Sequence, residues 1–404
     1  MYMDSDSEIK YTVRKRYHIE QTLLNSIESI NTTYDSRYYY ETLWDCMGWK
    51  SNINNVFESQ GLSKMVFISN ISNILRNIED SSQEVVLDNF LQELNNLILE
   101  YKKMDEEIIN IIIYTNIPKK LEENNKFRDA LKYFNLSIFD YSEYNFENEE
   151  DCDYDIKNKF NSKFLMLKYS KRGKDYEYIK NNTFNKIYSF FGYVTYIHKY
   201  KNGTEKFHIN EITLDNKITD LKINALIATD SNNNIFDIIH QQDVMDTAIK
   251  LDKSKIIKFD NQMKLVPTLL EDVYKINNNI LFDQLKDYFS LYYISSLESS
   301  IENSFLKFWS LSERIIKDIH VGMADKLLVK YMEKILQMYN YPKKIIQRLK
   351  FIKSKRNDLV HENIHGEITQ SDQSIVKILS EILIGFLIDY YGEVNNLQDY
   401  ANFM

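Results

Sequence analysis

The sequence contains few of the residues that build disulfide frameworks, metal sites or catalytic glycine loops. Its two cysteines, Cys46 and Cys152, stand far apart among 404 residues and in no metal-like spacing, so neither a zinc site nor a disulfide framework is expected. Only 9 glycines and 3 prolines are present, which predicts long regular elements. No phosphate-binding glycine loop and no Gly-x-Ser-x-Gly segment occurs, which argues against P-loop nucleotide hydrolysis and the usual serine hydrolases.

Long apolar runs are also absent. No stretch approaches the roughly 20 residues that a transmembrane helix needs. Residues Met1 to Arg16 mix acids and bases and have no apolar centre, unlike a secretion signal. We therefore expect a cytoplasmic protein with no membrane partner. Because 404 residues exceed one ordinary core, the length predicts two or three domains.

The hydrophobic pattern predicts an α+β fold whose parts differ in texture. Residues 1–139 are mostly helical in pattern, with apolar residues at three- and four-residue steps. One β-branched run there, Ile108 to Tyr114, favours a buried strand and with it a small α/β element. Residues 140–160 include eight acids between Asp140 and Asp155 and no base in that run, which is typical of a solvated linker or loop.

Residues 161–270 change to alternation and turn signals. The aromatic-rich segment Tyr188 to Tyr200 precedes Asn202-Gly203, and Asn and Gly tolerate the positive φ of a hairpin turn. We expect a β-rich middle domain here, with a sensing or regulatory role. Residues 275–404 predict an all-α bundle. The expected helices span Asn279 to Leu297, Ser299 to Ile319, Ala324 to Tyr339, Pro342 to Glu362, and Gln370 to Tyr391. The last is mostly apolar and should be buried inside the bundle or between subunits.

One further absence is local. From Lys334 to Asn357 the chain has no Asp or Glu, although its overall net charge is −9. Affinity for phosphates follows the local patch rather than the total charge, so this stretch predicts a nucleic-acid-binding surface. The cations expected to bind RNA are Lys343, Lys344, Arg348, Lys350, Lys353 and Lys355.

The acid-free stretch runs into the segment Arg356-Asn357-Asp358-Leu359-Val360-His361. In phosphate-ester chemistry, histidine can transfer protons near neutral pH, arginine can clamp a phosphoryl oxygen, and asparagine can orient either one. On a helix, Asn357 and His361 share a face, but Arg356 lies about 140° around from His361. Convergence would need a distorted helix end, the reach of the arginine or a second copy of the motif. Alternatively, Arg356 and His361 only cap the basic end of a helix.

In this context the segment resembles the signature of the HEPN ribonuclease superfamily, in which an Arg beside a polar residue precedes a His. The stretch Phe305 to Glu313, with Trp309 four residues before Glu313, is similar to a helix of the Apea-like, abortive-infection branch. The resemblance covers residues 279–404 only. It implies a metal-independent endoribonuclease, active as a homodimer, in which the 2′-hydroxyl attacks the adjacent phosphate to leave a 2′,3′-cyclic phosphate and a 5′-hydroxyl.

The resemblance also implies roles for single residues. His361 would be the acid or base, Arg356 the phosphate clamp and Asn357 the orienting residue. Glu313 and Asp358 would be supporting residues, with Glu313 either paired with Arg356 or part of a salt-bridge network. No cofactor or metal is expected.

The partners that follow are RNA, a second copy of the chain, and an antitoxin or phage-derived trigger, as for an effector of an antiviral, abortive-infection or toxin-type system. The alternative is a catalytically silent, dimerising RNA- or nucleotide-binding module. Trp309 itself, at helical spacing with Phe305 and Phe308, is expected in the core rather than as a base-stacking platform.

Overall fold

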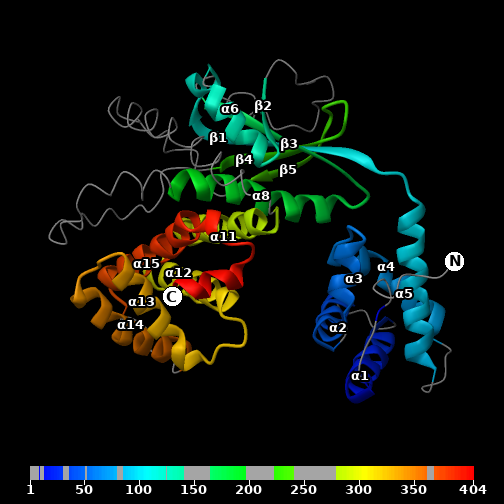
Figure 1. The fold of residues 1–404 in the computed structure, drawn as a ribbon. Helices are drawn as coiled ribbons and strands as arrows, with labels where there is room; N and C mark the ends of the chain where they lie inside the picture. Colours follow the sequence, from blue (N-terminus) through cyan, green and yellow to red (C-terminus); the bar gives the residue numbers. More distant parts are fainter. Residues whose placement is uncertain are drawn as a thin grey trace. The chain divides into compact units, whose positions relative to one another are not determined.

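The computed structural model shows an α+β protein (Figure 1). It describes residues 9, 13–30, 36–50, 52–79, 85–123, 125–140, 164–196, 223–240, 279–361 and 368–404. The chain divides into two compact units. The first contains Met1–Ile111, Ser170–Asn182 and Thr229–Phe236, and the second Ile112–Tyr169, Thr183–Ala228 and Asp237–Met404. None of the helices in these described ranges is long and apolar enough to cross a membrane.

The first unit is built mainly from helices, as predicted for the N-terminal region. These are α1 (Val13–Ile30), α2 (Ser36–Lys50), α3 (Ile53–Ser59), α4 (Lys64–Ile78) and α5 (Val86–Lys103). Aromatic rings fill their core: the Trp44 ring centroid lies 5.2 Å from that of Phe57 and 5.0 Å from that of Phe67. Ser63 is the N-cap of α4. Its side chain accepts a hydrogen bond from the Met65 amide, which has no partner within the first helical turn.

A five-stranded sheet has the strand order β2-β3-β1-β4-β5. Its strands are β1 (Glu107–Pro118), β2 (Leu136–Phe139), β3 (Phe164–Gly173), β4 (Ile223–Thr229) and β5 (Ile235–His240); the short helix η1 (Lys119–Glu123) and α6 (Asn125–Tyr133) connect β1 to β2. Strands β2 and β3 pair antiparallel. The buried strand predicted at Ile108 to Tyr114 is confirmed. The sheet therefore takes strands from both sides of the acidic segment at residues 140–160, of which all but Asp140 lies outside the described residues.

Helix α8 (Tyr176–Tyr196) corrects the prediction for the aromatic segment that begins at Tyr188. Residues 188–196 are helical rather than part of a hairpin, and the expected turn at Asn202-Gly203 lies outside the described residues. Aromatic residues fit any buried surface, and here burial against another helix outweighs their preference for strands. Gly192 allows the close approach: a Cβ at this position would lie 1.8 Å from the backbone oxygen of Phe289 in α11.

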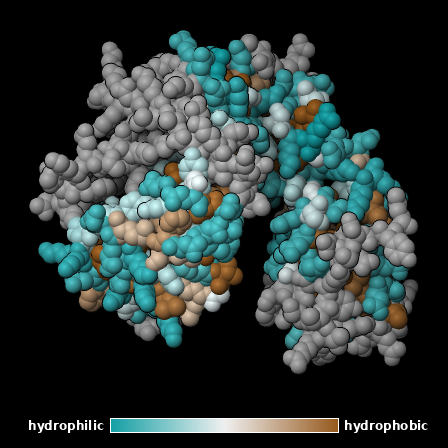
Figure 2. Space-filling view, in the orientation of Figure 1, coloured by the Kyte–Doolittle hydropathy of each residue, from teal (hydrophilic) through white to brown (hydrophobic). Residues whose placement is uncertain are grey.

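The C-terminal residues form a helical bundle, as predicted. Its elements are α11 (Asn279–Leu297), α12 (Ile301–Ile319), η5 (Asp325–Leu327), α13 (Leu328–Met338), α14 (Lys343–His361), α15 (Gln370–Asp389), η6 (Tyr391–Glu393) and η7 (Leu397–Phe403). Helix α15 packs along α12 and is buried inside the bundle over most of its length. Trp309 is 1% exposed and belongs to the core, as expected. The visible face of these helices mixes hydrophilic and hydrophobic side chains (Figure 2).

Candidate nucleic-acid site on helix α14

Helix α14 positions Arg356 of the motif against α12. One guanidinium nitrogen of Arg356, Nη2, lies 3.7 Å from the Glu313 Oε2 carboxylate oxygen. The other, Nη1, donates a hydrogen bond to Asn357 Oδ1 at 3.2 Å. A guanidinium has five N–H donors in a planar fork, so these two contacts orient Arg356 without using its full capacity for a phosphoryl oxygen.

Glu313 belongs to a chain of alternating charges that extends beyond Arg356. The ammonium of Lys317, one turn further along α12, donates to Glu313 Oε1 at 2.7 Å and lies 3.0 Å from Asp325 Oδ1. Hydrogen bonds to the carboxylates of Glu313 and Asp325 raise the pKa of Lys317. The hydrogen bond from Lys317 in turn lowers the pKa of Asp325. The two alternatives for Glu313 therefore both occur: it pairs with Arg356 and is a member of a salt-bridge network.

The structure places the remaining motif residues on α14 without showing that they converge. Asp358 is half-buried on this helix. His361 is the last residue of α14, and its side chain lies outside the described part of the chain. Straight-helix geometry puts positions 356 and 361 about 140° apart. The described residues thus bring together Arg356, Asn357 and Glu313, whereas the relation of His361 to them stays a prediction.

Of the six cations predicted to bind RNA, three contact oxygen atoms of neighbouring elements and three are exposed. Two of them hold the start of α15: Arg348 Nη2 lies 2.9 Å from Asp372 Oδ1, and Lys355 Nζ lies 2.8 Å from Asp372 Oδ2. Lys353 donates to the backbone oxygen of Asp325 at 3.1 Å. The other three, Lys343, Lys344 and Lys350, are exposed. Lys350 Nζ lies 3.8 Å from Glu333 Oε1, which is a long ion pair.

Asp372 is the residue that sequence reasoning missed. Its side chain is fully buried and forms a capping box with Thr369 at the start of α15. Burial alone would raise the pKa of this carboxyl group, but hydrogen bonds from Lys355, Arg348 and Thr369 outweigh burial and lower it to about 2. The spacing of Thr369 and Asp372 ahead of an apolar run is a known cap signal. This spacing could have predicted the helix cap, but not that Arg348 and Lys355 would bind the Asp372 carboxylate.

A second buried carboxylate lies deeper in the bundle. Glu381 of α15 is 2% exposed. Its Oε1 accepts a hydrogen bond from the Tyr292 hydroxyl at 2.5 Å and lies 2.6 Å from Lys377 Nζ. Burial and the nearby carboxylate raise the pKa of Tyr292 well above its ordinary value, so this phenol stays protonated as a donor. The cluster satisfies a buried charge between α11 and α15.

Among the described residues, no group of three or more His, Cys, Asp or Glu side chains is arranged to hold a metal ion. Comparisons of this chain with protein-family models, curated proteins and solved structures found no match.

Proposed function

We propose that helices α11 to α15 form a metal-independent endoribonuclease of the HEPN type, acting in the cytoplasm as the effector of an antiviral, abortive-infection or toxin-type defence system. The observation that carries the proposal is the placement of Arg356. It is held by Glu313 of α12 and by Asn357 near the C-terminal end of α14, one helical turn and a half before His361. An arginine oriented in this way suits a phosphoryl oxygen on which charge develops.

In the proposed reaction, the 2′-hydroxyl oxygen attacks the adjacent phosphorus and gives its proton to a base. The bond from phosphorus to the 5′-oxygen breaks, and that oxygen takes a proton from an acid. The products are a 2′,3′-cyclic phosphate and a 5′-hydroxyl, with no net redox change. His361 supplies the proton transfer, since an imidazole titrates near neutral pH, and Arg356 neutralises the charge gathered on the phosphoryl oxygens.

A homodimer would provide two copies of the motif at one site. Helix α15 is buried inside its own bundle, so the contact between copies would use other surfaces. Val360, which directly precedes His361, is 48% exposed. We place the contact at this end of α14. A stable dimer would bury more than roughly 1,000 Å² in total.

Expression of the wild type and of H361A tests the activity. The wild type should cut RNA and be toxic, whereas H361A should do neither; H18A, which removes a histidine from α1, is the matched control. Cleavage should survive EDTA, and the fragments should begin with a 5′-hydroxyl. Fragments ending in an ordinary 3′-hydroxyl, or activity that EDTA abolishes and magnesium restores, would contradict the mechanism. Sequencing the 5′-hydroxyl ends formed in cells would identify the RNA that is cut.

The alternative function, a non-catalytic dimerising module that binds RNA or a nucleotide, is favoured by one observation. Arg348, Lys355 and Arg356 each contact a carboxylate of their own chain, so these cations have a structural task. The two functions give different results with the same variants. If the chain is a non-catalytic module, K350E should lose RNA binding, H361A should keep it, and the wild type should not cleave RNA.

A further inference from the structure

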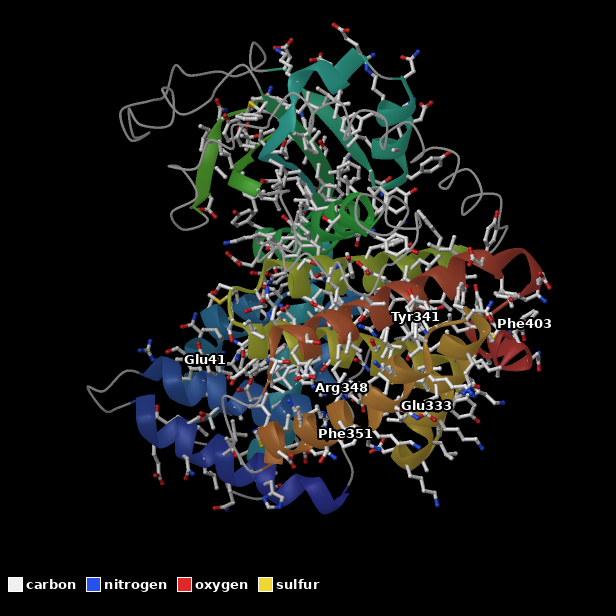
Figure 3. All side chains as sticks on the ribbon, turned by 90° about the vertical axis from the view of Figure 1, so that its left-hand side faces the viewer. Glu41, Glu333, Tyr341, Arg348, Phe351 and Phe403 are labelled. Atoms are coloured by element: carbon white, nitrogen blue, oxygen red, sulfur yellow. The ribbon has the colours of Figure 1, made fainter. Side chains whose placement is uncertain are left out.

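A groove with a volume of about 790 Å³ lies between α13 and α14. Tyr341 lines it from the turn between the helices, Glu333 from α13, and Lys343, Lys350 and Phe351 from α14. Figure 3 labels Glu333, Tyr341 and Phe351, which come from these three segments. The size is that of a site for a small ligand or a few linked monomers rather than for a folded partner.

Phe351 is the feature of the groove that needs an explanation. Its neighbours Leu349 and Ile352 are completely buried, but Phe351 itself is 66% exposed. Exposing a phenyl ring to water is unfavourable by about 25 cal/mol for each Å². A flat exposed ring is, however, the surface on which an unpaired base stacks, and such stacking works with every base.

The charges around the ring favour a polyanion. Lys343 and Lys350 line the groove and Lys344 is exposed beside Lys343, whereas the one acid among the lining residues is Glu333. Glu333 is 20% exposed and already lies 3.8 Å from Lys350 Nζ. None of the exposed residues that the structure describes on α14 is acidic. Phosphates next to a stacked base would therefore meet lysines.

Helix geometry connects the groove with the motif. At 100° per residue, positions 343, 350 and 354 lie within about 20° of position 361, on one face of α14. Position 351 is about 80° away from this line. Ten residues separate Phe351 from His361, or about 15 Å along the helix axis. A nucleic-acid strand lying on this face would span that distance with a few nucleotides.

We propose that the groove binds single-stranded RNA, with a base stacked on Phe351 and the flanking phosphates at Lys343 and Lys350, and that it directs the strand toward the end of α14. The inference rests on the proposed function in taking RNA as the substrate. It adds the strand type and the residues that bind it. Paired bases are not available for stacking, so the groove selects unpaired segments.

The test measures fluorescence anisotropy of a short labelled poly(A) RNA with the full chain carrying H361A, which prevents cleavage during the measurement. F351A should weaken binding about 10-fold, the order expected for one stacked base. F351L should weaken it equally, because leucine keeps the apolar volume and lacks the flat ring, whereas F351W should retain it. K350E should also weaken binding and reduce its salt dependence. The control K326E reverses an exposed lysine outside the groove and should bind like the parent.

A duplex RNA of the same length should bind more weakly than poly(A) and be insensitive to F351A. If F351L, F351A and K350E all bind poly(A) like the parent, the proposal is overturned. In that case a change of sedimentation with F351A would identify the groove as a contact between two copies of the chain. The two proposals can fail separately. If RNA binding depends on Phe351 but the wild type does not cleave RNA, the groove proposal holds and the nuclease proposal is overturned. If the wild type cleaves RNA and the groove variants cleave it equally well, the nuclease proposal holds and the groove proposal is overturned.

Discussion

Arg348 and Asp372 are joined by two hydrogen bonds, from Nε at 3.2 Å and Nη2 at 2.9 Å, both to Oδ1 of a carboxylate that is fully buried. Lys355 binds the other carboxylate oxygen. Two cations of the acid-free stretch thus fix the start of α15 to α14. The cations of this stretch therefore have two uses in the structure: Arg348 and Lys355 hold the bundle together, whereas Lys343, Lys344 and Lys350 are exposed to solvent.

D372N should lower the free energy of unfolding by about 2 kcal/mol, measured by urea denaturation near neutral pH. Breaking a fully buried ion pair typically costs roughly 3–5 kcal/mol. The loss is smaller here because Arg348 and Lys355 are 43% and 23% exposed and regain hydration. D389N, at the other end of α15, is the control and should have little effect. Equal stability of D372N and the wild type would show that the pair does not stabilise the fold.

The same carboxylate predicts a pH dependence. Hydrogen bonds lower the pKa of Asp372 from 3.8 to about 2 in the folded chain. Its stabilising contribution is therefore complete above about pH 5 and is lost as the pH falls through about 2, by about 2 kcal/mol in all. The difference in unfolding free energy between the wild type and D372N should shrink over this window. A difference that stays constant from pH 5 to pH 2 would contradict the lowered pKa.

E313Q tests whether Glu313 positions Arg356. The ion pair is 3.7 Å long and both side chains are partly exposed, so stability should change by less than about 1 kcal/mol. Cleavage should nevertheless fall about 10-fold in kcat with little change in KM, because a displaced guanidinium reaches the transition state poorly. E298Q removes another surface pair, that with Lys307, and should leave kcat unchanged. An unchanged kcat in E313Q would mean that the network has a structural task only.

Local patterns were enough to predict the bundle. The predicted helix Asn279 to Leu297 coincides with α11, and the other predicted helices differ from the observed ones by a few residues at their ends, apart from the η5 turn ahead of α13. Apolar periodicity and turn residues act over one or two helical turns, so they can be read from the sequence. For α8 the aromatic composition predicted strands, and only its contact with α11, through Gly192, explains the helix.

The candidate site was predicted less completely, because its contacts join residues far apart in the chain. The motif identified Arg356 and Asn357, and the resemblance of the stretch Phe305 to Glu313 named Glu313 with two alternative roles. The structure shows that Glu313 pairs with Arg356 and also with Lys317. The cations Arg348 and Lys355 were expected to face RNA, and their pairing with Asp372 depends on how α15 packs, which no local pattern reveals. The catalytic role of His361 stays a prediction.

G192A should destabilise the bundle by about 3 kcal/mol or more. A Cβ at Gly192 would lie 1.8 Å from the Phe289 backbone oxygen, so α8 and α11 would have to separate along a packed interface. G392A is the matched control, because nothing lies within 4 Å of a Cβ there. Thermal unfolding followed by circular dichroism compares the two variants. A melting temperature for G192A equal to that of G392A would show that the two helices are not in close contact.

Mixing two inactive variants tests whether the site is shared between protomers. Positions 356 and 361 lie about 140° apart on one helix, so the economical arrangement combines Arg356 of one copy with His361 of the other. R356A and H361A should each be inactive alone. After co-expression, random pairing makes about half of the dimers mixed, and each mixed dimer has one of its two sites intact, so about a quarter of the wild-type cleavage should return. The mixed dimer can be purified with two different affinity tags, and its sedimentation confirms the dimer. No recovery from a verified mixed dimer, or cleavage by a strictly monomeric wild type, would show that one protomer supplies both residues.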